Sequence, residues 1–153
     1  MNFSINPIGT IHNDRAAISD DFWGDVVSEI KLNDDIPLAA FDGLEDFSHA
    51  EIFFIFHKAD PADIVWDSAH PRENLAWPKV GVYAQRKKNR PNHIGATICE
   101  IIKKEGRTLV VKGLDAIDST PVVDIKPVLK EFLPRTELHQ PEWTSELMKD
   151  YWK

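Results

Sequence analysis

The residues best suited to bind a charged ligand lie between Arg86 and Gly95, directly after a predicted strand. This loop reads Arg-Lys-Lys-Asn-Arg-Pro-Asn-His-Ile-Gly and so combines cationic side chains, amides and a proline. An arginine guanidinium can hold a carboxylate through two parallel hydrogen bonds, an asparagine can fix a polar edge, and Pro91 restricts the backbone between them. The composition fits a ligand-binding loop, and it also fits a solvated basic turn.

Three aspartates, Asp115, Asp118 and Asp124, form a second polar group, and each has an apolar neighbour. They lie between predicted strands, where an aspartate often caps a turn by accepting hydrogen bonds from its own backbone. Each carboxylate therefore remains open to a role in a turn or in ligand binding.

Two histidines, His49 and His57, bracket the most hydrophobic part of the chain, Ile52 to Phe56. This apolar run is short and rich in β-branched and aromatic residues, which predicts a central buried strand. A continuous strand would hold the two histidines about 26 Å apart, so they could not share a metal ion. No metal site is predicted.

The elements that must position these residues are short strands. Six or seven segments have strand-like composition and are bounded by turn residues, namely 5–11, 26–32, 52–56, 80–84, 94–102, 108–112 and 121–125. No sustained β-α-β alternation and no G-x-G-x-x-G sequence is present, which argues against a Rossmann fold. We therefore predict a mainly β protein, a single-domain β-barrel with peripheral helices over residues 1–153.

The remaining segments predict a long connection and two helical pieces. Residues 58–78 contain three prolines and read as a connection of a length that is often functional. Residues 44–47 could form one helical turn. A C-terminal helix is predicted over about 142–152, because Trp143, Leu147, Tyr151 and Trp152 recur at a spacing of three to four residues. We interpret this aromatic face as core or dimer packing.

Composition restricts the class of protein. A chain of 153 residues with 42% hydrophobic residues can bury one substantial core, and its single cysteine, Cys99, permits no intrachain disulfide. Cys99 lies in an apolar run and is expected to be a buried small hydrophobe. No apolar run is long enough to cross a bilayer and the start lacks a secretory signal, so we expect a cytoplasmic protein that does not bind membranes.

The net charge of −7 opposes contact with phosphate backbones on average, but basic residues gather in one region. Seven of the 18 basic residues belong to this cluster: Arg86, Lys87, Lys88, Arg90, Lys103, Lys104 and Arg107. Such a run is usually a solvated face. A local phosphate-binding patch, and with it tRNA as a partner, remains open.

Three stretches together resemble the TsaA-like (TrmO/YaeB) family of S-adenosylmethionine-dependent tRNA methyltransferases. They are Phe47-Ser48-His49 before a strand that ends at His57, the loop from Gln85 to Gly95, and Leu114-Asp115 through Thr120-Pro121-Val122-Val123-Asp124-Ile125-Lys126-Pro127. Their order and approximate spacing match the family, and the resemblance is strongest over 47–127.

The resemblance implies a β-barrel that binds S-adenosylmethionine as a homodimer, and N6-methylation of threonylcarbamoyladenosine next to the tRNA anticodon. The implied cofactor-binding residues are His57, Lys58, Arg86, Leu114, Asp115, Ala116, Ile117 and Asp118, with Trp23 and Gly24 near the place of the family's N-terminal cofactor segment. Arg90 and Asn92 match the motif and suit either the substrate or the cofactor, and the basic cluster adds Lys87 and Lys88 as candidate substrate-binding residues. His57, Asp115 and Asp118 are the candidate general bases.

The sequence departs from the family's motifs at four positions. Gln85 stands in place of threonine, Asn89 in place of an apolar or aromatic residue, His93 in place of proline, and Ser119 in place of glycine. Two alternatives therefore stay open beside the tRNA enzyme. One is a methyltransferase that acts on another small molecule or RNA, and the other is a non-catalytic S-adenosylmethionine-binding module.

Overall fold

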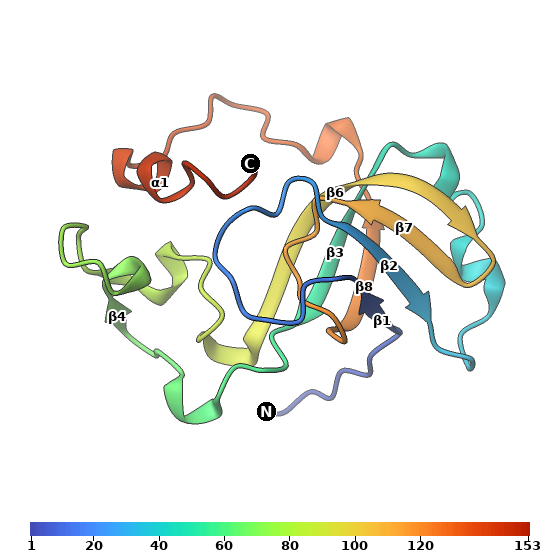
Figure 1. Ribbon diagram of the computed structural model, residues 1–153, viewed down its shortest axis with the longest axis horizontal. Helices are drawn as coiled ribbons and strands as arrows, with labels where there is room; N and C mark the ends of the chain where they lie inside the picture. The colour runs from blue at the N-terminus through green and yellow to red at the C-terminus, as the bar shows by residue number, and fades with distance from the viewer.

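The computed structural model describes residues 1–153 and contains a closed antiparallel barrel, shown in Figure 1. Around the barrel the strands follow the order β1-β2-β7-β6-β3-β8. Their bounds are β1 (Gly9–His12), β2 (Val27–Leu32), β3 (His49–Ile55), β6 (Ile94–Glu105), β7 (Thr108–Lys112) and β8 (Pro121–Pro127). The predicted mainly β class with a barrel is therefore confirmed.

The barrel closes because each strand has one apolar face. In β2, Ser28, Ile30 and Leu32 point inward and are buried, while the residues between them are exposed. The one polar side chain of this set, Ser28, accepts a hydrogen bond from Asn13 Nδ2 at 2.9 Å, which satisfies it in the interior. The buried core consists of Ile11, Ile30, Leu32, Phe41, Ala50, Ile52, Phe54, Cys99, Leu109, Val111, Leu114, Ala116 and Val122.

Cys99 is part of that core, as predicted. Its side chain is 2% exposed, and burial raises the pKa of the thiol to about 12. A thiol that stays protonated at neutral pH is a poor nucleophile, so the structure supports a packing role.

A close approach joins β3 and β6 at the start of β6. Gly95 lies opposite Phe54 in the ladder, and the Phe54 ring packs against the glycine. A methyl group on residue 95 would overlap the ring, whereas Gly81 has no heavy atom closer than 3.8 Å to such a methyl.

We expect Gly95→Ala to lower the free energy of unfolding by about 1–3 kcal/mol, because the buried Phe54 ring cannot move without disturbing the core. Urea denaturation measures this change, and Gly81→Ala is the matched control that leaves stability nearly unchanged. Equal stabilities of the two variants would contradict this packing.

The long connection forms a lobe beside the barrel, on the left of Figure 1. It carries a two-stranded ladder of β4 (Ser68–Ala69) and β5 (Val80–Gly81). The predicted strand over 80–84 is wrong beyond Gly81, because β4 offers only two partners and residues 82–84 turn into a 3-10 helix. Single 3-10 turns span Leu38–Phe41, Leu44–Asp46, Pro61–Asp63, Pro71–Glu73, Val82–Ala84, Pro91–His93 and Lys130–Phe132.

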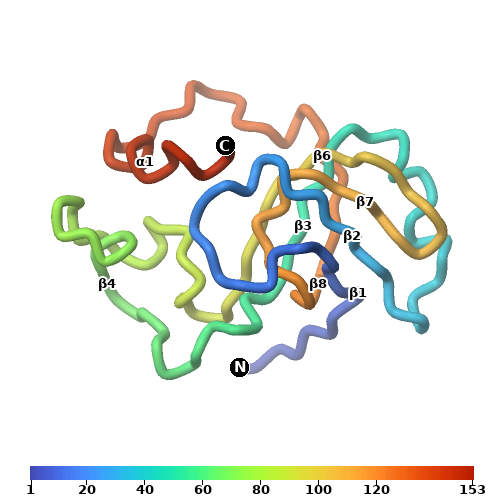
Figure 2. Tube along the Cα trace, viewed as in Figure 1, coloured from blue at the N-terminus to red at the C-terminus, as the bar shows by residue number.

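The C-terminal helix α1 (Glu142–Leu147) is shorter than the predicted 142–152. The chain leaves the helix after Leu147 because its end binds the β1–β2 loop instead. The amides of Phe22 and Trp23 donate to the carbonyls of Asp150 and Tyr151 at 3.1 and 2.8 Å. Figure 2 shows this end of the chain beside the β1–β2 loop. None of the helices has the length and apolar character needed to span a membrane.

Candidate cofactor and substrate site

A cavity of about 250 Å³ lies where β3 ends and β6 begins. It is lined by Phe54, Phe56, Tyr83, Gln85, Arg86, Arg90, Ile94, Gly95, Ala96, Thr97 and Asp115. The structure thus brings together Arg86 and Arg90 from the basic loop with Asp115 from the aspartate-rich segment. Two cationic side chains, one carboxylate and several aromatic rings therefore line the same cavity.

The basic loop is held in place by its own polar side chains. Arg90 Nη1 donates to the carbonyl of Gln85 at 2.7 Å, and the Arg86 guanidinium donates to the carbonyl of Ala96. Gln85 is buried, and its amide nitrogen donates to the carbonyls of Ala69 and Val80 at 2.9 and 3.0 Å. Gln85, which stands in place of the family's threonine, therefore connects the basic loop to the β4–β5 ladder.

Asp115 is held by two hydroxyl groups. Thr97 Oγ1 donates to one carboxylate oxygen, and the Tyr151 hydroxyl donates to the other. Burial, together with the negative charge of Asp115, raises the pKa of Tyr151 well above its usual range, so the phenol keeps its proton and remains a donor. Asp115 is thus fixed in orientation beside the two arginines.

His57 and Asp118 form a neighbouring cluster outside this cavity. His57 Nδ1 lies 3.2 Å from Thr120 Oγ1, and Asp118 accepts hydrogen bonds from Ser119 Oγ and the Asn13 amide at 2.9 and 3.2 Å. Partial desolvation and the charge of Lys58 lower the pKa of His57, while the Ser119 hydrogen bond lowers the pKa of Asp118. Near neutral pH, the first can accept a proton and the second stays ionised.

The β1–β2 loop connects these predicted residues. The Asp118 amide donates to the carbonyl of Arg15 at 2.8 Å, and Lys58 Nζ donates to that of Ala16 at 3.0 Å. The Arg15 guanidinium lies 4.0 Å from the centre of the Trp23 ring, which is buried.

Several predicted site residues do not line the cavity. Leu114, Ala116 and Trp23 are buried in the interior, so their side chains cannot face a ligand in solution. Gly24 is covered by the carbonyl of Trp152, where any side chain would clash. The other predicted residues outside the lining are His57, Lys58, Ile117, Asp118, Lys87, Lys88 and Asn92.

Two departures from the family motif have a visible backbone consequence. Ser119 has a φ of 67°, in the left-handed region where glycine is favoured, which explains why a glycine suits this position. His93 has a φ of 51°, which proline cannot adopt, so the loop differs here in backbone shape as well as in side chain.

Thr97, Tyr151 and the aromatic lining were not predicted as site residues. Thr97 carries a weak signal, since it is a polar residue between apolar neighbours in β6. Nothing in the sequence around Tyr151 indicates a role in the site, because its partner Asp115 lies 36 positions earlier in the chain. The C-terminal aromatic face, interpreted from sequence as core or dimer packing, therefore also contacts the site.

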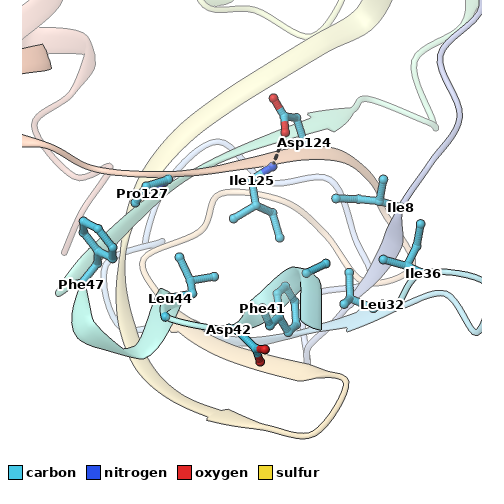
Figure 3. A pocket seen from close by; sticks show the side chains of 12 residues that line it. Ile8, Leu32, Ile36, Phe41, Asp42, Leu44, Phe47, Asp124, Ile125 and Pro127 are labelled. Atoms are coloured by element: carbon cyan, nitrogen blue, oxygen red, sulfur yellow. Dashed lines mark hydrogen bonds between the residues drawn. The ribbon is translucent and has the colours of Figure 1, made fainter. Parts of the chain in front are cut away.

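A larger cavity of about 450 Å³ lies at the opposite end of β3 and is mostly apolar (Figure 3). Its two carboxylates are engaged outside it: Asp124 lies 2.7 Å from Lys126 Nζ, and Asp42 lies 3.9 Å from Lys104 Nζ. Asp124 also accepts a hydrogen bond from the Ile125 amide, drawn in Figure 3. This cavity offers no free charged group, so it is the poorer candidate for a polar cofactor.

Comparisons with known proteins agree with the fold and with the motifs. A family model described as the tRNA-methyltransferase O N-terminal domain matches residues 15–132. The chain is 43% identical over 90 residues to the tRNA (adenine(37)-N6)-methyltransferase of Mus musculus, a match that covers 59% of this chain and 20% of the mouse protein. It is 33% identical over 135 residues to a "Probable S-adenosyl-L-methionine-binding protein" of Methanothermobacter thermautotrophicus, covering 86% of this chain and 93% of that protein.

A solved structure supports the same relationship. The crystal structure of TrmO from Pseudomonas aeruginosa matches with a TM-score of 0.74 and 27% identity, over 91% of this chain and 61% of that chain. The chain spans about a fifth of the length of the mammalian relatives that it matches. With the family model covering residues 15–132, the chain belongs to the family of tRNA-methyltransferase O N-terminal domains.

Proposed function

We propose that the chain binds S-adenosylmethionine and transfers its methyl group to tRNA, at N6 of the threonylcarbamoyl-modified adenosine beside the anticodon. The observation that carries this proposal is the cavity in which Arg86, Arg90 and Asp115 meet. The names of the mouse and archaeal relatives support the reaction and the cofactor. A tRNA substrate would place the protein in the cytoplasm.

The chemical groups of the cavity fit the cofactor. When bound, S-adenosylmethionine supplies a methyl group already activated on a sulfonium. Arg86 would bind the carboxylate, since its guanidinium lines the cavity. Asp115, fixed by Thr97 and Tyr151, would accept hydrogen bonds from an ammonium or from ribose hydroxyls. The faces of Phe56 and Tyr83 would attract positive charge.

The chain must also align the attacking nitrogen and accept its proton. His57 suits the second task, because its lowered pKa leaves the ring neutral near pH 7. Asp118 is a weaker base than His57, because the pKa of its carboxyl group is lowered from a value that is already acidic. Asp115 lies closer to the arginines but already accepts two hydrogen bonds. We therefore favour His57 as the base.

Two measurements test this function in sequence. Calorimetric titration with S-adenosylmethionine should show binding, and incubation with methyl-labelled cofactor and total tRNA should then label the tRNA. Binding without tRNA labelling would replace the proposal by a methyltransferase for another substrate or a cofactor-binding module. Absence of cofactor binding would contradict it entirely.

We further propose a homodimer. The C-terminal aromatic face does not support it, because Trp143 packs on Trp77 and Tyr151 binds Asp115 within the chain. The support comes instead from two apolar side chains on β6, Ile98 and Ile102, which are 46% and 47% exposed.

Sedimentation velocity at micromolar concentration should therefore show a species of twice 17.4 kDa. Replacing Ile98 and Ile102 by lysine should shift it to the monomer, because charged side chains disfavour burial. Ile18→Lys changes an equally exposed isoleucine outside the sheet and should leave the dimer intact. A parent protein that sediments only as a monomer would refute the dimer.

A further inference from the structure

Two large aromatic side chains stand exposed at one end of the β4–β5 ladder. Trp66 is 73% exposed and Tyr83 is 76% exposed. The Val82 amide donates to the carbonyl of Asp67 at 2.8 Å and so extends the ladder by one step. Trp66 and Tyr83 follow directly beyond this hydrogen bond, one on each segment. Neither ring pairs with another aromatic ring of the chain.

The same end of the ladder touches the basic loop. The Val65 amide donates to the carbonyl of Asn89 at 3.1 Å, which places Trp66 next to the loop that carries Lys87 and Lys88. Tyr83 itself lines the cavity together with Arg86. One residue of the pair therefore lines the cavity, and the other follows a residue that is bonded to the basic loop.

The cations of this loop have no carboxylate partner, unlike Lys103 and Lys104 of the basic cluster. Lys103 pairs with Glu105 at 2.9 Å and Lys104 with Glu45 at 3.0 Å. Arg107 Nη1 donates hydrogen bonds to the carbonyls of Asn33 and Ile36. No salt bridge includes Arg86, Lys87, Lys88 or Arg90. On a chain with a net charge of −7, this is the surface that attracts an anion.

We propose that Trp66 and Tyr83 form a stacking platform for unpaired bases of the RNA that flank the methylated nucleotide. The proposal rests on the proposed function, since it assumes RNA at the cavity. Exposed aromatic rings beside free cations are the combination that binds single-stranded nucleic acid, because bases stack on the rings while phosphates meet the charges. A second copy of the chain fits less well, since a two-fold contact through this face would bring two basic loops together.

The experiment compares alanine and phenylalanine at each ring. Binding of fluorescently labelled, unfractionated tRNA should weaken about fivefold or more in Trp66→Ala and Tyr83→Ala, because one base loses its stacking partner. Trp66→Phe and Tyr83→Phe should retain most of the affinity, since a ring remains. Phe132→Ala, which removes an aromatic side chain that is 87% exposed elsewhere, is the matched control and should bind like the parent.

Three further readouts separate this proposal from its alternatives. The salt dependence of tRNA binding should stay unchanged in the alanine variants, because stacking releases no counterions. Cofactor binding by Trp66→Ala should equal that of the parent. If the parent methylates tRNA and both alanine variants bind it equally well, the platform is refuted while the proposed function stands.

Two remaining outcomes also overturn the platform. A parent that binds S-adenosylmethionine but no tRNA would refute both the platform and the tRNA substrate. Alanine variants that lose the dimer in sedimentation without losing tRNA affinity would assign this surface to a second copy of the chain.

Discussion

Arg86→Ala is expected to weaken S-adenosylmethionine binding roughly 10- to 150-fold, which corresponds to about 1.5–3 kcal/mol. The loss is large because the guanidinium lines the cavity and no lysine or arginine other than Arg90 does so. Arg86 also donates to the carbonyl of Ala96, so its removal affects the loop as well as the ligand. Isothermal calorimetry measures the affinity.

Two controls separate these effects. Arg86→Lys keeps the charge but lacks the planar pair of donors, and it should recover part of the affinity. Arg135→Ala removes an exposed arginine that does not line the cavity and should leave the affinity unchanged. Urea denaturation of Arg86→Ala shows whether the fold survives. A stable Arg86→Ala protein with parental affinity would exclude Arg86 from the cofactor site.

The double substitution Lys87→Glu, Lys88→Glu should abolish tRNA methylation while leaving cofactor binding intact. Both lysines lie in the basic loop, neither lines the cavity, and neither is paired with a carboxylate. Each phosphate contact contributes close to one unit to the slope of log affinity against log salt. Removing two contacts should therefore reduce that slope by about two, as measured by tRNA binding at several salt concentrations.

The basic cluster supplies a matched control for this variant. Lys103→Glu, Lys104→Glu makes the same change in charge, but these lysines already pair with Glu105 and Glu45. It should affect tRNA binding far less. Equal losses in the two double variants would show that only net charge matters, and undiminished methylation by Lys87→Glu, Lys88→Glu would remove the loop from the RNA-binding surface.

The barrel was predictable from sequence because its strands carry their own signal. β2 alternates buried and exposed residues, and β3 ends in a short run of β-branched and aromatic residues. The ends of two elements were predicted less well, because contacts with distant parts of the chain determine where each element stops. The strand expected over 80–84 stops at Gly81 since β4 is only two residues long. The helix expected to Trp152 stops at Leu147 since the carbonyls of Asp150 and Tyr151 bind the β1–β2 loop.

The site was predictable in part, and for a related reason. The family motif pointed to Arg86 and Asp115, and the structure places both at one cavity. Motif positions do not distinguish side chains from backbone, so Leu114 and Ala116 were included although their side chains are buried. Trp66 lies in the long connection and Tyr83 in the predicted strand over 80–84, and neither belongs to one of the three family motifs. Only the ladder that joins their segments reveals that they are neighbours.

The attachment of Tyr151 to Asp115 sets an order in which the molecule can be built during translation. β1 pairs with β8 through Gly9 and Val122, so a nascent chain cannot close its barrel before the last strand has left the ribosome. Even then Asp115 lacks one of its two donors until residue 151 has emerged. The walls of the cavity are therefore completed after the barrel, and a stalled chain that stops before Tyr151 would present a folded barrel with a loosened site.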